Sequence, residues 1–150
     1  MPVVAESVHI ASEPEVVFAY LSDASNVAQW DRSIVAAEQL DSGPISAGTR
    51  WRGTSKILGR TFRWVTEVTE IHAPERMSSR SVEGDLTFTA SYRLRPIAGA
   101  TLLTYRLEAE SGLGGLFGRL GDPLVQNAQS RAVRGSLARL AQLLSAQPVR

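Results

Sequence analysis

The chain has 150 residues, of which 43% are hydrophobic and 21% charged, an ordinary balance for one globular domain with a full core. The formal net charge of +1 argues against nucleic-acid binding, because a DNA or RNA footprint needs a concentrated excess of basic residues. The absence of cysteine excludes disulfides, thiol catalysis and cysteine-ligated metals.

Neither a leader nor a membrane span is indicated by the pattern of apolar residues. The first ten residues lack the basic and long apolar runs of a signal peptide. No segment approaches the ~20 consecutive apolar residues that a membrane helix needs. We therefore expect a cytoplasmic protein without stable membrane insertion.

The beginning of the chain predicts a strand that leads directly into a helix. Residues 4–10 alternate in polarity, which indicates a half-buried strand whose inward side is aliphatic apart from Glu6. The following residues form a capping-box pattern, in which Ser12 caps the amide of Glu15 while Glu15 reaches back. This pattern predicts a helix over residues 13–21.

The middle of the chain predicts a second short helix and then a series of strands. After a break at residues 23–26, a helical segment ends at Trp30. Six alternating segments follow, separated by short turns rich in Gly, Pro and Asp. They span residues 33–40, 49–58, 60–72, 76–82, 86–95 and 101–110. Short connections and one polar face predict an antiparallel meander.

The last long element is an amphipathic helix. Asp122 and Pro123 indicate its start, because an Asp side chain caps free amides and Pro suits the first helical position. Apolar and small residues recur at steps of three, four or seven as far as Leu144, which gives a helix roughly 34 Å long. The centre of its apolar stripe carries only Ala128, Ala132 and Ser136. Either the sheet approaches closely there, or a cavity is left.

These elements predict one α+β domain over residues 1–150 with a helix-grip fold. A seven-stranded antiparallel sheet wraps around the long C-terminal helix, and two short helices follow the first strand. The order of elements resembles the START-like superfamily, within it the polyketide cyclase/dehydrase and lipid-transport branch. The segments that carry this resemblance are Ala11-Ser12-Glu13-Pro14-Glu15-Val16-Val17-Phe18, Trp30-Asp31, Val68-Thr69-Glu70 with Ala73-Pro74-Glu75-Arg76, and Gly114-Gly115-Leu116-Phe117 before Pro123-Leu124-Val125.

The resemblance implies a deep apolar cavity between the sheet and the long helix. Across the superfamily such cavities hold lipids, sterols, hormones, alkaloid precursors and aromatic polyketides. It also implies that Trp30 closes one end of the cavity. Because function varies widely on one fold, the resemblance alone gives no mechanism.

Strand parity places aromatic residues on the inward side of the sheet, where they are candidates for ligand contact. The expected ligand-binding set is Trp30, Trp51, Trp64, Phe88, Tyr92, Tyr105, Phe117, Val125, Ala128, Gln129 and Ala132. Polar groups that would orient a ligand are Tyr92, Tyr105, Gln129, Ser136 and Glu6. The alternative is a core that these side chains fill.

No catalytic residue is singled out by spacing. His9 and His72 are expected at the surface. A proton-transferring group would come from Glu6, Asp31, Tyr92 or Tyr105, although Asp31 is more simply explained as a turn residue. There is no metal-ligand spacing and no nucleophile motif, so no metal and no cofactor are predicted.

The glycine-rich segment 112–118 invites a dinucleotide-binding interpretation, which we reject. The third glycine of the motif would fall on Phe117, and the preceding strand belongs to an antiparallel meander. The alternatives are an apolar flap beside the cavity mouth and a plain corner between strand and helix.

Three functions remain open at this point. The first is carriage or sensing of a small hydrophobic or aromatic molecule, lipid-like or polyketide-like, which would be the main partner. The second is a polyketide aromatase/cyclase or dehydratase that acts in the same cavity. The third is a protein-interaction module that presents its bound ligand through residues 112–121.

Overall fold

The architecture is that of one curled antiparallel sheet with helices on one side. A computed structural model describes residues 3–57, 59–109 and 123–145. The strands are β1 (Val3–Ile10), β2 (Ile34–Gln39), β3 (Arg50–Ile57), β4 (Arg60–His72), β5 (Arg76–Gly84), β6 (Phe88–Ile97) and β7 (Ala100–Ala109). The helices are α1 (Pro14–Leu21), α2 (Ala24–Trp30) and α3 (Pro123–Ser145).

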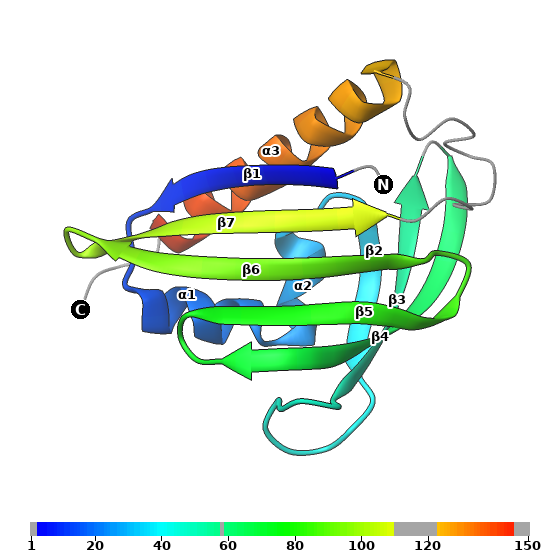
Figure 1. Ribbon diagram of the computed structural model, residues 1–150, viewed down its shortest axis with the longest axis horizontal. Coiled ribbons are helices and arrows are strands. Elements are labelled where there is room, and N and C mark those ends of the chain that lie inside the picture. The colour runs from blue at the N-terminus through cyan, green and yellow to red at the C-terminus, as the bar shows by residue number, and fades with distance from the viewer. Residues whose placement is uncertain (1–2, 58, 110–122, 146–150) are drawn as a thin grey trace.

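The sheet order confirms the predicted meander. The seven strands lie in the order β1-β7-β6-β5-β4-β3-β2, and each neighbouring pair is antiparallel. β1 thus adds to the last strand of the meander, which places the beginning of the chain beside its later part. The three helices lie behind the sheet in Figure 1, with α3 running behind β1. This is the predicted helix-grip fold.

The pleat of the strands fixes which residues face the helices. Along β4, Phe62, Trp64, Thr66 and Val68 are buried, whereas Arg63 between them is exposed. The same alternation was predicted from sequence, because successive side chains of a strand point to opposite faces. The inward face of β4 is therefore apolar and aromatic.

The predicted capping box at the start of α1 is wrong. The residue that caps α1 is Glu13, and its side chain makes no capping hydrogen bond. Instead, the Ser12 hydroxyl donates to the carbonyl of Leu144 at 3.3 Å, and the carbonyl of Ser12 accepts from the Thr101 hydroxyl at 2.7 Å. Carbonyls in the last turn of a helix have no partner within the helix, so Ser12 satisfies one in α3.

The second short helix begins earlier than predicted. Asp23 belongs to its start, not to a break, because its carboxylate accepts from the backbone amide of Ser25 at 3.0 Å. This is the usual way in which an Asp side chain caps a helix. α2 therefore spans Ala24–Trp30, and it carries Trp30 at its last position.

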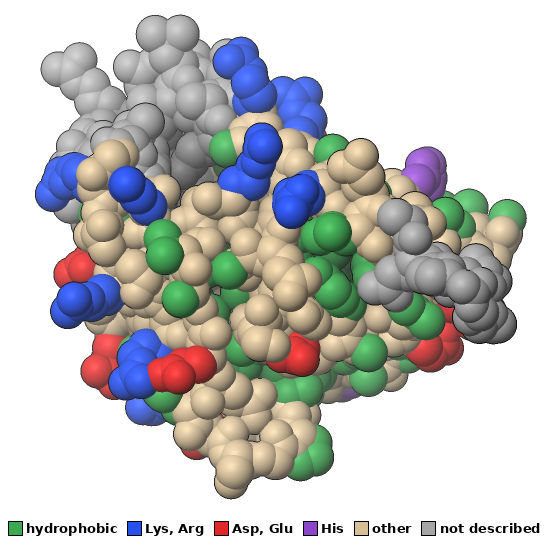
Figure 2. Space-filling view, turned by 180° about the vertical axis from the view of Figure 1, so that it is seen from behind, with side chains coloured by type: hydrophobic (Ala, Val, Ile, Leu, Met, Phe, Trp, Pro, Cys, Tyr) green, Lys and Arg blue, Asp and Glu red, His purple; other side chains and the backbone are tan. Residues whose placement is uncertain are grey.

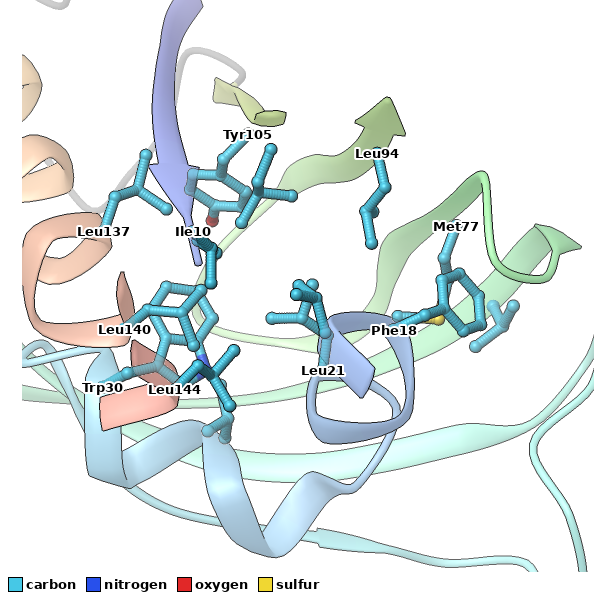
Figure 3. Close-up of a cluster of buried hydrophobic side chains, with 14 residues drawn as sticks. Ile10, Phe18, Leu21, Trp30, Met77, Leu94, Tyr105, Leu137, Leu140 and Leu144 are labelled. Atoms are coloured by element: carbon cyan, nitrogen blue, oxygen red, sulfur yellow. The ribbon is translucent and has the colours of Figure 1, made fainter. Parts of the chain in front are cut away.

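The main hydrophobic core lies where α1, α2 and the second half of α3 meet the sheet. Leu137, Leu140 and Leu144 of α3 pack into one cluster with Ile10 and Trp30 (Figure 3). All five side chains are almost completely buried. The core thus occupies one end of the space that the curled sheet encloses.

Candidate functional site

A cavity of about 510 Å³ lies between the inward face of the sheet and the middle of α3. Its walls come from the turn after α2, from β3 to β7, and from residues 131–136 of α3. Ligand pockets in proteins usually measure roughly 300–1,000 Å³. The small residues at the centre of the helix therefore leave a space of ligand size.

All members of the expected ligand-binding set whose side chains are described lie on this cavity. These are Trp30, Trp51, Trp64, Phe88, Tyr92, Tyr105 and Ala132. Phe117 lies outside the described residues, as do the side chains of Val125, Ala128 and Gln129. The structure thus brings seven of the predicted residues around one space, and their contact with a ligand stays a prediction.

Three aromatic rings form one end of the cavity. Tyr92 of β6 and Tyr105 of β7 are directly paired across the two strands, and their rings stack with centroids 5.2 Å apart. The Trp30 ring packs with its edge against both, at 6.3 Å from each centroid. Such pairs contribute about 0.5–1.5 kcal/mol each beyond their burial, so this end is held rigidly.

A second aromatic wall is built on β3, β4 and β6. The Trp64 indole N–H donates to the Ser55 hydroxyl at 2.9 Å, and Phe88 packs edge-on against the Trp64 ring at 6.2 Å. Gly53 lies opposite Trp64 across the strands. A Cβ at Gly53 would come within 2.2 Å of the indole ring. The glycine is what allows the Trp64 ring to lie across β3.

Three donors on the cavity wall have no partner among the described residues. The Trp51 indole nitrogen is buried and forms no hydrogen bond there. No hydrogen bond joins the hydroxyls of Tyr92 and Tyr105 to the described part of the chain. The buried and unpaired Trp51 donor costs roughly 1–3 kcal/mol, which an acceptor on a bound molecule would offset.

Asp31 lies at the same end of the cavity as the two tyrosines and has two roles. As predicted, it is a turn residue: its carboxylate accepts from the backbone amide of Ser33 at 3.0 Å and from the Ser33 hydroxyl at 2.8 Å. It also lines the cavity. Burial raises the pKa of Asp31, and the two bonds from Ser33 oppose that rise.

The tyrosine hydroxyls remain protonated at neutral pH. Burial raises the pKa of Tyr92, and the Asp31 carboxylate adds to the shift. Burial likewise raises the pKa of Tyr105, with further contributions from Tyr92 and Asp31. Both phenols are therefore hydrogen-bond donors for a carbonyl or hydroxyl on a ligand.

Glu6 does not lie among the cavity-lining residues, contrary to one of our expectations. Its carboxylate is 3.8 Å from the guanidinium of Arg134 on α3. The inward side of β1 faces that helix, so the partner of Glu6 is a helix residue and not a ligand. Ser136, by contrast, does line the cavity, and its hydroxyl accepts from the backbone amide of Arg32 at 3.2 Å.

Sequence reasoning missed Arg32, Arg131 and Gly135, which also line the cavity. Both arginines occupy positions that the sequence pattern assigns to a polar surface. It is the tertiary fold that brings them to the cavity. Gly135 offered a signal, because a glycine inside a long helix costs about 1 kcal/mol relative to Ala and so suggests a local reason.

Neither a membrane-spanning helix nor a cluster of metal ligands is present within the described residues. Among them, no helix combines the length and the apolar character that crossing a membrane requires. In the same part of the chain, no group of three or more His, Cys, Asp or Glu side chains is arranged to hold a metal ion. His9 and His72 are both exposed, as predicted.

Comparison with known proteins identifies the family. The model of the family described as polyketide cyclase/dehydrase and lipid transport matches residues 1–145. The chain belongs to this family. No curated protein sequence matches the chain. The predicted membership of the polyketide cyclase/dehydrase and lipid-transport branch is thereby confirmed.

Solved structures from diverse organisms share the fold of this family member. TTHA0849 from Thermus thermophilus is 24% identical, with a TM-score of 0.78 over 97% of this chain and 100% of that chain. A START superfamily protein from Mycobacterium smegmatis is 19% identical, with a TM-score of 0.70 over 95% and 94% of the two chains. Ginseng major latex-like protein 151 from Panax ginseng is 13% identical, with a TM-score of 0.72 over 95% and 96%.

Proposed function

We propose that the protein binds a small hydrophobic or aromatic molecule, lipid-like or polyketide-like, without covalent attachment, for carriage or sensing. The site is the cavity between the sheet and α3. The observation that carries this proposal is a space of about 510 Å³ walled by aromatic and aliphatic side chains, with unpaired donors on its walls. Membership of a family described by polyketide chemistry and lipid transport points the same way.

The chemistry of the walls supports an orienting role for a few polar groups. Apolar contact supplies most of the binding free energy for such a molecule, at roughly 25 cal/mol per Å² of surface removed from water. The Trp51 indole N–H and the Tyr92 and Tyr105 hydroxyls then select molecules that carry acceptors at matching positions. A ring ketone or phenol suits the tyrosine end.

The test is to plug the cavity and measure binding of an uncharged fluorescent probe, N-phenyl-1-naphthylamine. We expect Ala132→Trp, on the cavity wall, to abolish the fluorescence increase that the wild type produces. Ala138→Trp is the matched control, because Ala138 is exposed on the same helix and does not line the cavity. Equal binding by both variants would show that the probe lies elsewhere.

A complementary measurement is native mass spectrometry of protein purified without organic solvent. A defined mass adduct that is lost in the Ala132→Trp variant would identify the ligand class. An adduct that persists in that variant would contradict the cavity as its site.

A second candidate function, cyclisation or dehydration of a polyketide-like substrate, is favoured by one observation. A carboxyl group, Asp31, lines the same apolar cavity as two phenols, Tyr92 and Tyr105. In such an arrangement the carboxylate removes a proton next to a carbonyl, while a phenol donates to the developing enolate oxygen. We expect Asp31→Asn to abolish turnover of a poly-β-ketone thioester and to leave its binding nearly intact. Full turnover by that variant would rule out this role for Asp31.

The third possibility, a protein-interaction module, gains no support. Residues 112–121, which would present the ligand, lie outside the described residues.

A further inference from the structure

The rim of the cavity specifies the polar end of its ligand. We propose that the ligand is an amphipathic anion, with an apolar body in the cavity and an oxyanion head group, carboxylate or phosphate, bound by Arg32 and Arg131. This inference rests on the proposed function, because it concerns the same cavity.

The first observation is that these two arginines have no charged partner. Both are exposed and both line the cavity, yet neither guanidinium forms an ion pair or a hydrogen bond with the described residues. Nearby arginines of α3 are engaged: Arg134 lies 3.8 Å from the Glu6 carboxylate, and the Arg139 side chain donates to the carbonyl of Gln29 at 2.7 Å. Of the three arginines of α3, Arg131 is the one without such a partner among the described residues, and it lines the cavity.

The second observation is that the turn carrying Arg32 is attached to the same part of α3 that carries Arg131. The backbone amide of Arg32 donates to the Ser136 hydroxyl, which fixes the turn after α2 against α3. Arg131 lies five residues before Ser136, so about 7.5 Å of helix rise separates their backbones. Figure 2 shows basic side chains gathered over α3 on this side of the molecule.

The third observation is that there is open space beside Arg131 on the cavity side of α3. Gly135 follows Arg131 by one helical turn, so the two residues share a face of α3. A Cβ built at Gly135 would meet nothing within 4 Å, and Gly135 itself lines the cavity. A larger residue at this position would occupy the space beside the Arg131 side chain.

The charge balance at the cavity favours an anion. Asp31 is the one acidic residue among the described cavity-lining residues. One of its carboxylate oxygens already accepts two hydrogen bonds from Ser33. The two guanidinium groups therefore outnumber the one acidic group, and the electrostatic potential at the rim is positive.

The chemistry of arginine specifies the head group. A planar guanidinium with several fixed donors binds the oxygens of a carboxylate or a phosphate in pairs. The aliphatic wall below, with Val68, Met77 and Leu107, accepts an alkyl or ring body. An anionic amphiphile satisfies both regions at once, whereas an uncharged lipid would leave the guanidinium groups to water.

The experiment compares a charged and an uncharged ligand with the same tail. Dodecanoate and dodecan-1-ol are titrated against N-phenyl-1-naphthylamine bound to the protein at pH 8, where the carboxylate is ionised. We expect the double variant Arg32→Gln, Arg131→Gln to weaken dodecanoate about tenfold, since charge-assisted hydrogen bonds are lost. Dodecan-1-ol should bind this variant as it binds the wild type.

The control is Arg134→Gln, which removes one positive charge from α3 at a residue that does not line the cavity. It should leave dodecanoate affinity unchanged. Dodecyl phosphate in place of dodecanoate distinguishes the two head groups: the tighter of the two shows which head group the site prefers.

Three outcomes would overturn the proposal. In the first, the double variant binds dodecanoate and dodecyl phosphate as tightly as the wild type does. In the second, the double variant loses affinity for dodecan-1-ol by the same factor as for dodecanoate. In the third, Arg134→Gln weakens dodecanoate as much as the double variant does. In each of these cases the uncharged probe still binds, so the proposed function stands. If the wild type does not bind the uncharged probe at all, the proposed function fails, and this inference fails with it.

Discussion

The two parts of α3 that the structure describes in detail perform different tasks. Residues 137–145 carry Leu137, Leu140 and Leu144, all buried in the main core. Residues 131–136 carry Ala132 and Gly135 toward a cavity. One helix thus anchors itself at one end and forms the wall of a binding space at the other. The comparison teaches that a stable fold can leave a large cavity, provided that one packed end holds the helix in place.

The largest expected effect comes from removing a leucine at the packed end. Leu140→Ala should lower the free energy of unfolding by roughly 2–5 kcal/mol, because Leu140 is 0% exposed and truncation would leave a cavity in the core. Urea denaturation measures this change. Val133→Ala, at the cavity wall and half-buried, is the comparison and should cost less than half as much. Equal losses would show that both ends contribute equally to stability.

The next largest effect concerns the wall opposite the helix. Gly53→Ala should destabilise the protein by about 1–3 kcal/mol, because the new Cβ would lie 2.2 Å from atoms of the Trp64 ring and the indole would have to move. The displaced ring would also reduce binding of N-phenyl-1-naphthylamine. Thermal unfolding and probe titration measure the two effects. Gly99→Ala places its Cβ in open space but at a φ of 81°, so it strains the backbone without displacing the Trp64 ring; it should therefore leave probe binding unchanged.

That pair of predictions also shows what the sequence determines. The inward aromatic set of the sheet was predicted, since a strand has a period of two residues and one parity error would expose the whole set. Its described members are Trp51, Trp64, Phe88, Tyr92 and Tyr105. The order of the strands was predicted for a similar reason, because short turns leave few alternatives to a meander.

The details that sequence reasoning missed depend on contacts between distant parts of the chain. Ser12 fits a local capping pattern, yet its hydroxyl bonds to Leu144, which is 132 residues away. Glu6 faces inward as predicted, but Arg134 and not the cavity is its neighbour. Arg32 reaches the rim only because its amide bonds to Ser136. Local sequence patterns predict which residues share a face of a strand or helix and where turns lie. They do not predict which distant residue a polar group will contact.

A smaller effect is expected from the acidic residue at the cavity. In the folded state burial raises the pKa of Asp31 above its ordinary value of 3.8. At pH values just above 3.8 the folded protein therefore binds more protons than the unfolded chain. Stability contributed by this residue therefore falls as pH rises through that window. Asp31→Asn keeps an oxygen for Ser33 and should stabilise the protein at pH 7. Denaturation of the wild type and of Asp31→Asn from pH 3 upward measures the difference in their free energies of unfolding, which should vanish near pH 3. A stabilisation by Asp31→Asn that does not depend on pH would contradict this prediction.

The smallest expected effect tests the part of α3 that faces the cavity. Gly135→Ala should raise the free energy of unfolding by about 0.5–1 kcal/mol, because Ala is the better helix former and its Cβ would meet nothing within 4 Å. The reverse change at an exposed position of the packed part, Ala138→Gly, should lower it by a similar amount. If Gly135→Ala destabilised the protein instead, the space beside Arg131 would be filled, and the head-group site would be lost with it. If Gly135→Ala stabilises the protein while the probe still binds, the natural glycine lowers the stability of the fold. This is expected for a position that leaves room for a ligand.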